Sequence, residues 1–192
     1  LIPVGPGVYD ALESAAQQKA FTIAAATNTQ IVKSIHGQLD RALADGLTLA
    51  EFQANAAELL DAAGVTTRSP WYWETVYRTN LQTSYQVGRY EQMTDPDVLQ
   101  ARPYWRYISA RTPTSRPSHI ERHGLVLPAS DKFWQRWFPP NGFNCLCSVM
   151  TVSPSLLERR GWQVADRAQL DNLHYQLPDK GFGQNPALEE EI

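Results

Sequence analysis

Apolar residues recur at helical spacing through the first third of the chain. Between residues 31 and 46 they return every fourth position and a glycine follows them, which is typical of an amphipathic helix with a C-terminal glycine (Ile31, Ile35, Leu39, Leu43, Gly46). A second apolar stripe runs from Leu49 to Ala63, and Thr48 with Glu51 forms a capping-box pattern at its start. With an earlier helix expected over residues 9–20, the pattern predicts a helical hairpin or a small bundle.

A long aromatic-rich helix is predicted next. The Ser69–Pro70 pair is favourable for a helix start, and the helix is expected to continue to about residue 93. The Asp95–Pro96 pair is expected to stop it, because proline cannot continue a helix. Three polar side chains of this helix are expected on a solvated face: Arg78, Asn80 and Arg89.

The pattern changes to period two after Pro103. Residues 104–109 alternate as a half-buried strand does, and residues 125–127 are expected to form a second, short strand. The segment Pro139-Pro140-Asn141-Gly142 is a strong turn, and it leads into a predicted final strand over residues 143–149.

Two short helical segments complete the predicted elements, one over residues 131–138 and one from Ser153 to Gly161, before an extended tail. The sequence therefore predicts an α+β protein, in which an N-terminal helical region and a long helix pack with a small, mainly antiparallel sheet core. The predicted divisions are a helical region over 1–69, an α+β core with a His/Cys cluster over 70–152, and a short helix with a C-terminal tail over 153–192.

The composition supports a real core and limits the partners. Hydrophobic residues make up 43% of the 192 residues and charged residues 19%, with a net charge of −3. This balance disfavours a general nucleic-acid binder, although a local basic patch is expected around Arg111, Arg116 and Arg122. The sequence contains no apolar run long enough to span a membrane, so no membrane partner is expected.

The candidate chemistry gathers in residues 116–150. His119 and His123 are four residues apart and would share one face of a helical turn, and Cys145 and Cys147 would share one face of a strand. Two imidazoles and two thiolates are the ligands of a structural zinc site. The four residues are therefore predicted to bind a zinc ion that stabilises a small sheet-and-loop region.

Two other interpretations use the same residues. Free cysteines are commonly small buried hydrophobes, and a disulfide across the Cys-x-Cys spacing would be strained. One enzymatic alternative is a cysteine nucleophile with His119 or His123 as its base, oriented by Glu121 or Asp131. Another is a nuclease that uses His119 with Arg116 and Arg122 to hold phosphate. The sequence contains no Walker loop, G-x-S-x-G elbow or H-E-x-x-H motif.

Five sequence blocks occur along the chain in an order that indicates a family resemblance. They are KAFTIAAATNTQIVKSIHGQLDRALADGLTLAEFQANAAELLDAAG, YRTNLQTSYQVGRYEQM, RPSHIERHG, FPPNGFNCLCSV and PDKGFGQNPA. In this order they resemble the phage Mu F-like minor head proteins, a head-morphogenesis family of tailed phages and prophages. The family pairs an R-x-x-H-x-x-x-[D/H]-G segment with a downstream P-P-x-x-x-N-C-x-C segment. These motifs map onto Arg116, His119, His123, Gly124, Pro139, Pro140, Asn144, Cys145 and Cys147.

The resemblance implies a structural virion protein without enzymatic turnover. Its expected role is head morphogenesis at the portal vertex or inner capsid, with DNA packaging or delivery as a further role. Its expected partners are the portal protein, the major capsid protein and phage DNA, and its expected location is the virion, after assembly in the host cytoplasm. A packaged effector enzyme, nuclease-like or toxin-like, is the alternative function.

The resemblance also qualifies the predicted zinc ligands. The family often has an acidic residue at the position of His123, and often an arginine at that of Leu146, so a strict set of two histidines and two cysteines is not implied. Relatives also extend further upstream, so the start at Leu1 is expected to be a maturation cleavage or an excised segment.

Overall fold

The computed structural model describes residues 29–62, 70–173 and 176–188. It has two compact units, Leu1–Gly88 and Arg89–Ile192, and the division lies within the long helix α4 (Pro70–Thr94). Helices and a small antiparallel sheet confirm the predicted α+β class. The predicted division at residues 69 and 152 stays a prediction. Among the described helices, none combines the length and apolar character needed to cross a membrane.

The first unit is built on two packed helices, α2 (Thr29–Asp45) and α3 (Leu49–Ala62). The predicted capping box is present: the Thr48 N–H donates to Glu51 Oε2 (2.8 Å), and the Glu51 N–H donates to Thr48 Oγ1 (3.3 Å). The Thr48 N–H and, second, the Thr48 hydroxyl (2.7 Å) both donate to the Glu51 carboxylate and lower its pKa. The predicted helix over residues 9–20 lies outside the described residues.

Aromatic contacts fix the first part of α4 in this unit. The Phe52 ring lies 6.5 Å from that of Trp73 and 5.2 Å from that of Tyr77, and the Tyr77 hydroxyl donates to Leu47 O (2.6 Å). The expected solvated face is wrong for Asn80, which is fully buried and donates to Val76 O (2.7 Å). A side-chain amide can enter the interior when a helix carbonyl one turn earlier accepts its proton.

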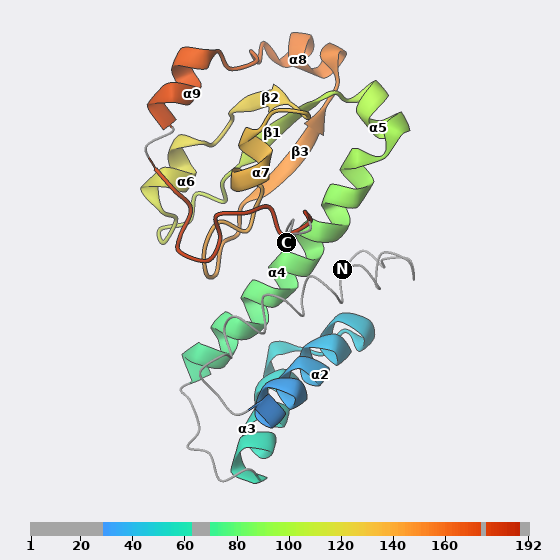
Figure 1. The fold of residues 1–192 in the computed structure, drawn as a ribbon, viewed down its shortest axis with the longest axis vertical. Coiled ribbons are helices and arrows are strands. Elements are labelled where there is room, and N and C mark those ends of the chain that lie inside the picture. The colour runs from blue at the N-terminus through green and yellow to red at the C-terminus, as the bar shows by residue number, and fades with distance from the viewer. Residues whose placement is uncertain (1–28, 63–69, 174–175, 189–192) are drawn as a thin grey trace. The chain divides into compact units, whose positions relative to one another are not determined.

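The second unit contains a three-stranded antiparallel sheet of β1 (Tyr104–Ile108), β2 (Val126–Pro128) and β3 (Ser148–Val152), in the order β2-β1-β3 (Figure 1). Trp105 pairs with Leu127 on one side and with Thr151 on the other. The first two strands are confirmed to within one residue. The predicted third strand is wrong in its start, because pairing begins at Ser148, after both cysteines.

One face of the sheet buries an aromatic core. Trp105 and Tyr107, which alternate with half-buried neighbours on β1, are 1% and 0% exposed. The Tyr90 ring, from the last turns of α4, packs edge-to-face on Trp105 (5.6 Å) and on Phe138 (5.1 Å). Arg89, from the preceding turn, donates to Val149 O (2.7 Å), so this end of α4 is bonded to β3 and is not a solvated surface there.

Short helices surround the sheet: α5 (Pro96–Ala101), α6 (Pro117–Glu121), α7 (Phe133–Trp137), α8 (Pro154–Arg160) and α9 (Arg167–Leu173) (Figure 1). The last of these was not predicted, because its segment has weak periodicity. The helix α8 has the predicted limits, with a Ser153 side-chain cap and Gly161 in the left-handed region at φ 63°. The Asp95–Pro96 pair ends α4 as predicted, and Asp95 also caps α5.

The segment after α9 lies against the turn that precedes the cysteines. The Asp179 N–H donates to Asn141 O (3.0 Å), and the Asp179 carboxylate pairs with Arg116 (2.5 Å). A Cβ atom at Gly142 would collide with both members of this ion pair. Further along, Phe182 packs edge-to-face on Phe143 (4.9 Å). Three of the sequence blocks therefore meet in one place.

The capping box generates the first prediction. Replacing Thr48 with Ala should lower the free energy of unfolding by about 1 kcal/mol, because the hydroxyl that accepts the Glu51 N–H is lost. Urea unfolding followed by circular dichroism measures the change. Thr48→Ser keeps the hydroxyl and should retain most of the stability. Equal losses in the two variants would contradict the assigned cap.

The close packing at Gly142 generates the second prediction. Gly142→Ala should destabilise the chain by about 1 kcal/mol, since a Cβ atom there must displace the side-chain ends of Arg116 and Asp179 and weaken their ion pair. Gly183→Ala is the matched control, because a Cβ atom there would meet nothing within 4 Å, and its effect should stay within about 0.5 kcal/mol. Urea unfolding followed by tryptophan fluorescence compares the two. A Gly142→Ala protein as stable as the control would contradict the packing described here.

Candidate metal centre

The centre joins a short helix to an extended loop. His119 lies on α6, which begins at Pro117, and Cys145 and Cys147 lie on the segment between the 139–142 turn and β3. Although this segment is not a paired strand, its side chains alternate: both cysteines are 3% exposed, whereas Leu146 between them is 51% exposed. The prediction that the two thiols share a face therefore holds without the predicted strand.

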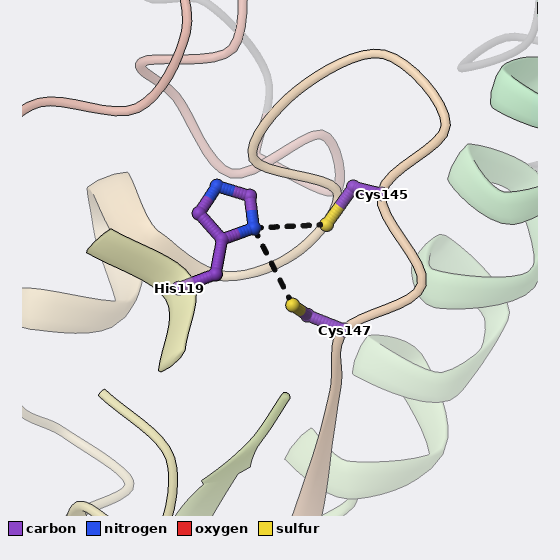
Figure 2. Close-up of side chains that lie close together, drawn as sticks. All are labelled: His119, Cys145 and Cys147. Carbon is purple, nitrogen blue, oxygen red and sulfur yellow. Dashed lines mark hydrogen bonds between the residues drawn. The ribbon is translucent and has the colours of Figure 1, made fainter. Parts of the chain in front are cut away.

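One imidazole nitrogen faces both sulfur atoms (Figure 2). His119 Nδ1 lies 3.7 Å from Cys145 Sγ and 3.5 Å from Cys147 Sγ. The three atoms lie within 4.8 Å of one another, so the group could hold a metal ion. A tetrahedral zinc with Zn–S bonds of about 2.3 Å and Zn–N bonds of about 2.0–2.1 Å requires an N–S separation of about 3.6 Å. The observed separations fit that requirement.

A hydrogen bond between the two thiols shifts their pKa values in opposite directions. A hydrogen bond from Cys145 is the largest cause that lowers the pKa of Cys147, while burial opposes it and bonds from His119 and Tyr107 add to it. The same bond, together with burial, raises the pKa of Cys145. The directions of these two shifts favour a single thiolate in the pair, the form in which cysteine binds soft metals.

Tyr107 and Asn141 border the centre, and their roles were not predicted. The Tyr107 hydroxyl donates to Asn141 Oδ1 (2.8 Å), and both residues are fully buried. Burial is the first cause that raises the pKa of Tyr107, and the charges of Cys147 and Cys145 add to it. The alternation of β1 places Tyr107 in the core, but only the folded chain brings it to a thiol 40 residues away.

His119 is fixed from its other side by an aromatic ring. Its ring lies 6.1 Å from that of Trp137, at nearly a right angle. His119 Nε2 is buried and has no hydrogen-bond partner among the described residues, so the Nδ1 side carries the polar contacts of the ring. Metal-bound histidines usually donate from the second nitrogen, and no such partner is present in the described part of the chain.

His123 is not brought into the group. The helix α6 ends at Glu121, so the four-residue spacing no longer places His123 on the face of His119. His123 Nδ1 lies 3.2 Å from both the N–H and the carbonyl oxygen of Ser109. Burial is the main cause that lowers its pKa. Of the four predicted ligands, the structure brings together three, and metal binding itself stays a prediction.

The two arginines of the motif, Arg116 and Arg122, bond to other segments of the fold. Arg116 pairs with Asp179 and donates to Phe143 O (3.2 Å). Arg122 is 0% exposed, donates to Ser118 O (2.7 Å) and Leu173 O (2.5 Å), and stacks on Trp137 at 3.5 Å. Burial lowers the pKa of Arg122 to about 10. Of the basic patch expected around Arg111, Arg116 and Arg122, Arg116 is thus paired with a carboxylate and Arg122 is buried.

The other motif residues shape the backbone around the centre. Gly124 has φ 88° and its N–H donates to Tyr107 O (2.8 Å); a Cβ atom there would lie 3.0 Å from the Arg106 guanidinium. Asn144 also lies in the left-handed region, at φ 55°, just before the first cysteine. Pro139 and Pro140 are buried and joined by a cis peptide bond. Whether any of these residues contacts a partner stays a prediction.

Comparison with known proteins places the chain in a family. The putative capsid assembly protein F of Escherichia phage Mu is 34% identical over 173 residues, which cover 82% of this chain and 39% of that protein. The Mu-like prophage FluMu F protein of Haemophilus influenzae is 31% identical over 169 residues, which cover 82% of this chain and 40% of that protein. The chain thus spans about two fifths of the length of these curated relatives.

No solved structure matches the chain. The family described as Phage Mu protein F like protein matches residues 33–150, a range that runs from α2 into β3 and includes His119, Cys145 and Cys147. That range is more than half of the chain, and the chain belongs to the Phage Mu protein F like family.

Proposed function

We propose that this chain is part of a minor head protein that acts in head morphogenesis of a tailed phage or prophage. The observation that carries the proposal is the family match over residues 33–150, together with relatives of which one is named a capsid assembly protein. Its place is the portal vertex or inner capsid, with the portal protein or major capsid protein as its partner. A role in DNA packaging or delivery is part of the same proposal.

The loop that carries the cysteines supports a role in protein contact. Phe143 and Leu146 are 41% and 51% exposed, although the neighbouring Cys145 and Cys147 are buried in the core. Exposed apolar side chains on a fixed backbone are suitable anchors for a partner, because little conformational entropy is lost when they bind. This loop is therefore the surface through which we expect the head proteins to bind.

The three buried ligands support a structural zinc ion. Two thiolates and an imidazole suit zinc, and their separations fit tetrahedral coordination. The ion would join α6 to the loop before β3, two segments with few backbone hydrogen bonds between them. No turnover is assigned to this centre. Its three side chains are each 3% exposed, and that burial supports a structural role, since a reacting group must meet its substrate.

The metal proposal is tested by elemental analysis. The purified chain should carry about one equivalent of zinc, and Cys147→Ser should lose it, because a buried ligand is removed. His123→Asn is the matched control and should keep the metal, since His123 lies outside the group. Replacement by cobalt should give a thiolate-to-metal absorption band in the wild type and in the control. Wild-type protein without metal, or full retention in Cys147→Ser, would reject the centre.

The assembly proposal is tested in particles. The protein should be found by mass spectrometry in purified particles of the phage or prophage that encodes it, and its absence would reject the role. Leu146→Asp should lower the yield of infectious particles about tenfold, because a charge at an apolar contact weakens binding. Leu177→Asp is the control, since Leu177 is 65% exposed on another segment and should leave the yield unchanged. Metal content and circular dichroism should be unchanged in both variants.

A further inference from the structure

Three basic residues gather around the C-terminal half of β1: Arg106 on the strand, Arg111 just after it, and His123 on the segment that precedes β2. Ser109 contacts both His123 Nδ1 (3.2 Å) and the Arg111 N–H (3.4 Å), and the Arg106 guanidinium lies beside Gly124, the residue after His123. Burial first, and then the charges of Arg111 and Arg106, lower the pKa of His123. Within the described residues the ion pairs are Arg78 with Glu74 and Arg116 with Asp179, so these three side chains have no carboxylate partner there. Of the basic patch that the sequence indicated, Arg111 is retained in this cluster, and Arg106 and His123 take the places of Arg116 and Arg122.

The Arg106 guanidinium is held in place by its surroundings. It stacks over the Trp162 ring at 4.1 Å, and its Nη2 atom lies where a Cβ atom of Gly124 would be only 3.0 Å away. The Nε atom is buried and has no hydrogen-bond partner in the described chain. The group is therefore held in place by its neighbours, and its donors to a ligand are the Nη atoms, since Nε is buried.

His123 is oriented by the backbone at the end of β1. The Ser109 N–H lies 3.2 Å from His123 Nδ1. When Nδ1 accepts that proton, Nε2 carries the proton of the neutral ring and is a donor. In that tautomer the neutral imidazole can donate to an anion. The Ser109 carbonyl oxygen also lies 3.2 Å from Nδ1, and when Nδ1 donates to it, Nε2 is a donor only in the protonated ring.

Arg111 adopts a backbone conformation that side chains disfavour. It is one of two residues other than glycine with positive φ in the described chain, at 52°. A turn rich in hydroxyl groups follows it, in which the Thr112 N–H donates to Ser115 Oγ (2.8 Å) and the Thr112 and Thr114 hydroxyls lie 3.2 Å apart. The chain thus accepts local strain at a residue that adds a positive charge beside two others.

We infer that Arg106, Arg111 and His123 form a binding site for a phosphate group, supplied by the DNA backbone or by free phosphate. Gathering like charges without a carboxylate costs free energy, and a bound phosphate would offset it. Planar guanidinium groups bind phosphate oxygens through paired N–H donors, and the neighbouring hydroxyl groups can add further bonds. This site goes beyond the assembly role and is separate from the buried metal ligands.

The test compares neutral substitutions with a matched one elsewhere. Arg111→Asn removes the charge, and asparagine tolerates the left-handed conformation, so the fold should be kept and circular dichroism checks this. Arg136→Gln removes one charge from an exposed position on α7 and is the control. Binding of a short fluorescein-labelled DNA duplex is measured by anisotropy across a salt series. In parallel, NMR follows the amides of Ser109 and Gly124 as inorganic phosphate is added.

The expected result is DNA binding that Arg111→Asn weakens roughly five- to tenfold, with a salt dependence lower by about one phosphate contact, while Arg136→Gln leaves both unchanged. If DNA binding is unaffected but inorganic phosphate shifts those amides in the wild type and not in Arg111→Asn, the site stands and free phosphate is its ligand. If Arg111→Asn changes the binding of neither ligand, or Arg136→Gln weakens DNA binding equally, the inference is overturned. Neither outcome bears on particle assembly, which has its own test.

Discussion

The approach of one imidazole nitrogen to two sulfur atoms is the constraint around which the second unit is arranged. The contacts between His119 and the two cysteines close loops of 26 and 28 residues, which contain β2, α7 and the proline turn. The sheet between them is small, with strands of five, three and five residues, and contributes few backbone hydrogen bonds. Fixing α6 against the loop before β3 therefore decides where the intervening segments lie, with or without a bound ion.

A layer of buried polar groups extends that constraint to the end of the chain. Asn141 accepts the Tyr107 proton with its side chain and the Asp179 N–H with its backbone, so the sheet and the C-terminal segment meet at one residue. Arg122 has carbonyl acceptors and the face of Trp137 but no carboxylate within salt-bridge distance in the described chain. A buried guanidinium is costly unless its donors are satisfied, and here several backbone oxygens reduce that cost. The polar groups around the centre thus connect segments that apolar packing alone would leave loosely placed.

Features that depend on neighbouring residues were predictable from the sequence, and contacts between residues far apart in the chain were not. The Thr48–Glu51 cap, the Ser153 cap and Gly161 depend on hydrogen bonds within a few residues, so the sequence reveals them directly. The thiols share a face because alternation needs only extended backbone, and the absent strand pairing at Cys145 did not change it. His123 failed because its assignment assumed that a helix continued past Glu121. The partners of Arg116 and Tyr107 lie 63 and 34 residues away, respectively, and no spacing rule could identify them.

Because His123 lies outside the buried group, the family motif contributes to two separate features. One is the group of His119, Cys145 and Cys147, and the other is the basic cluster that includes His123. An acidic residue at this position, as the family often has, would not disturb a centre made of His119, Cys145 and Cys147, because residue 123 lies outside it. The same acidic residue would place a carboxylate beside Arg106 and Arg111 and neutralise part of their charge. The group of His119, Cys145 and Cys147 is therefore independent of residue 123, whereas the charge of the basic cluster depends on the residue that this chain has there. Variation at one site of the motif can thus change what the surface attracts without changing what holds the core together.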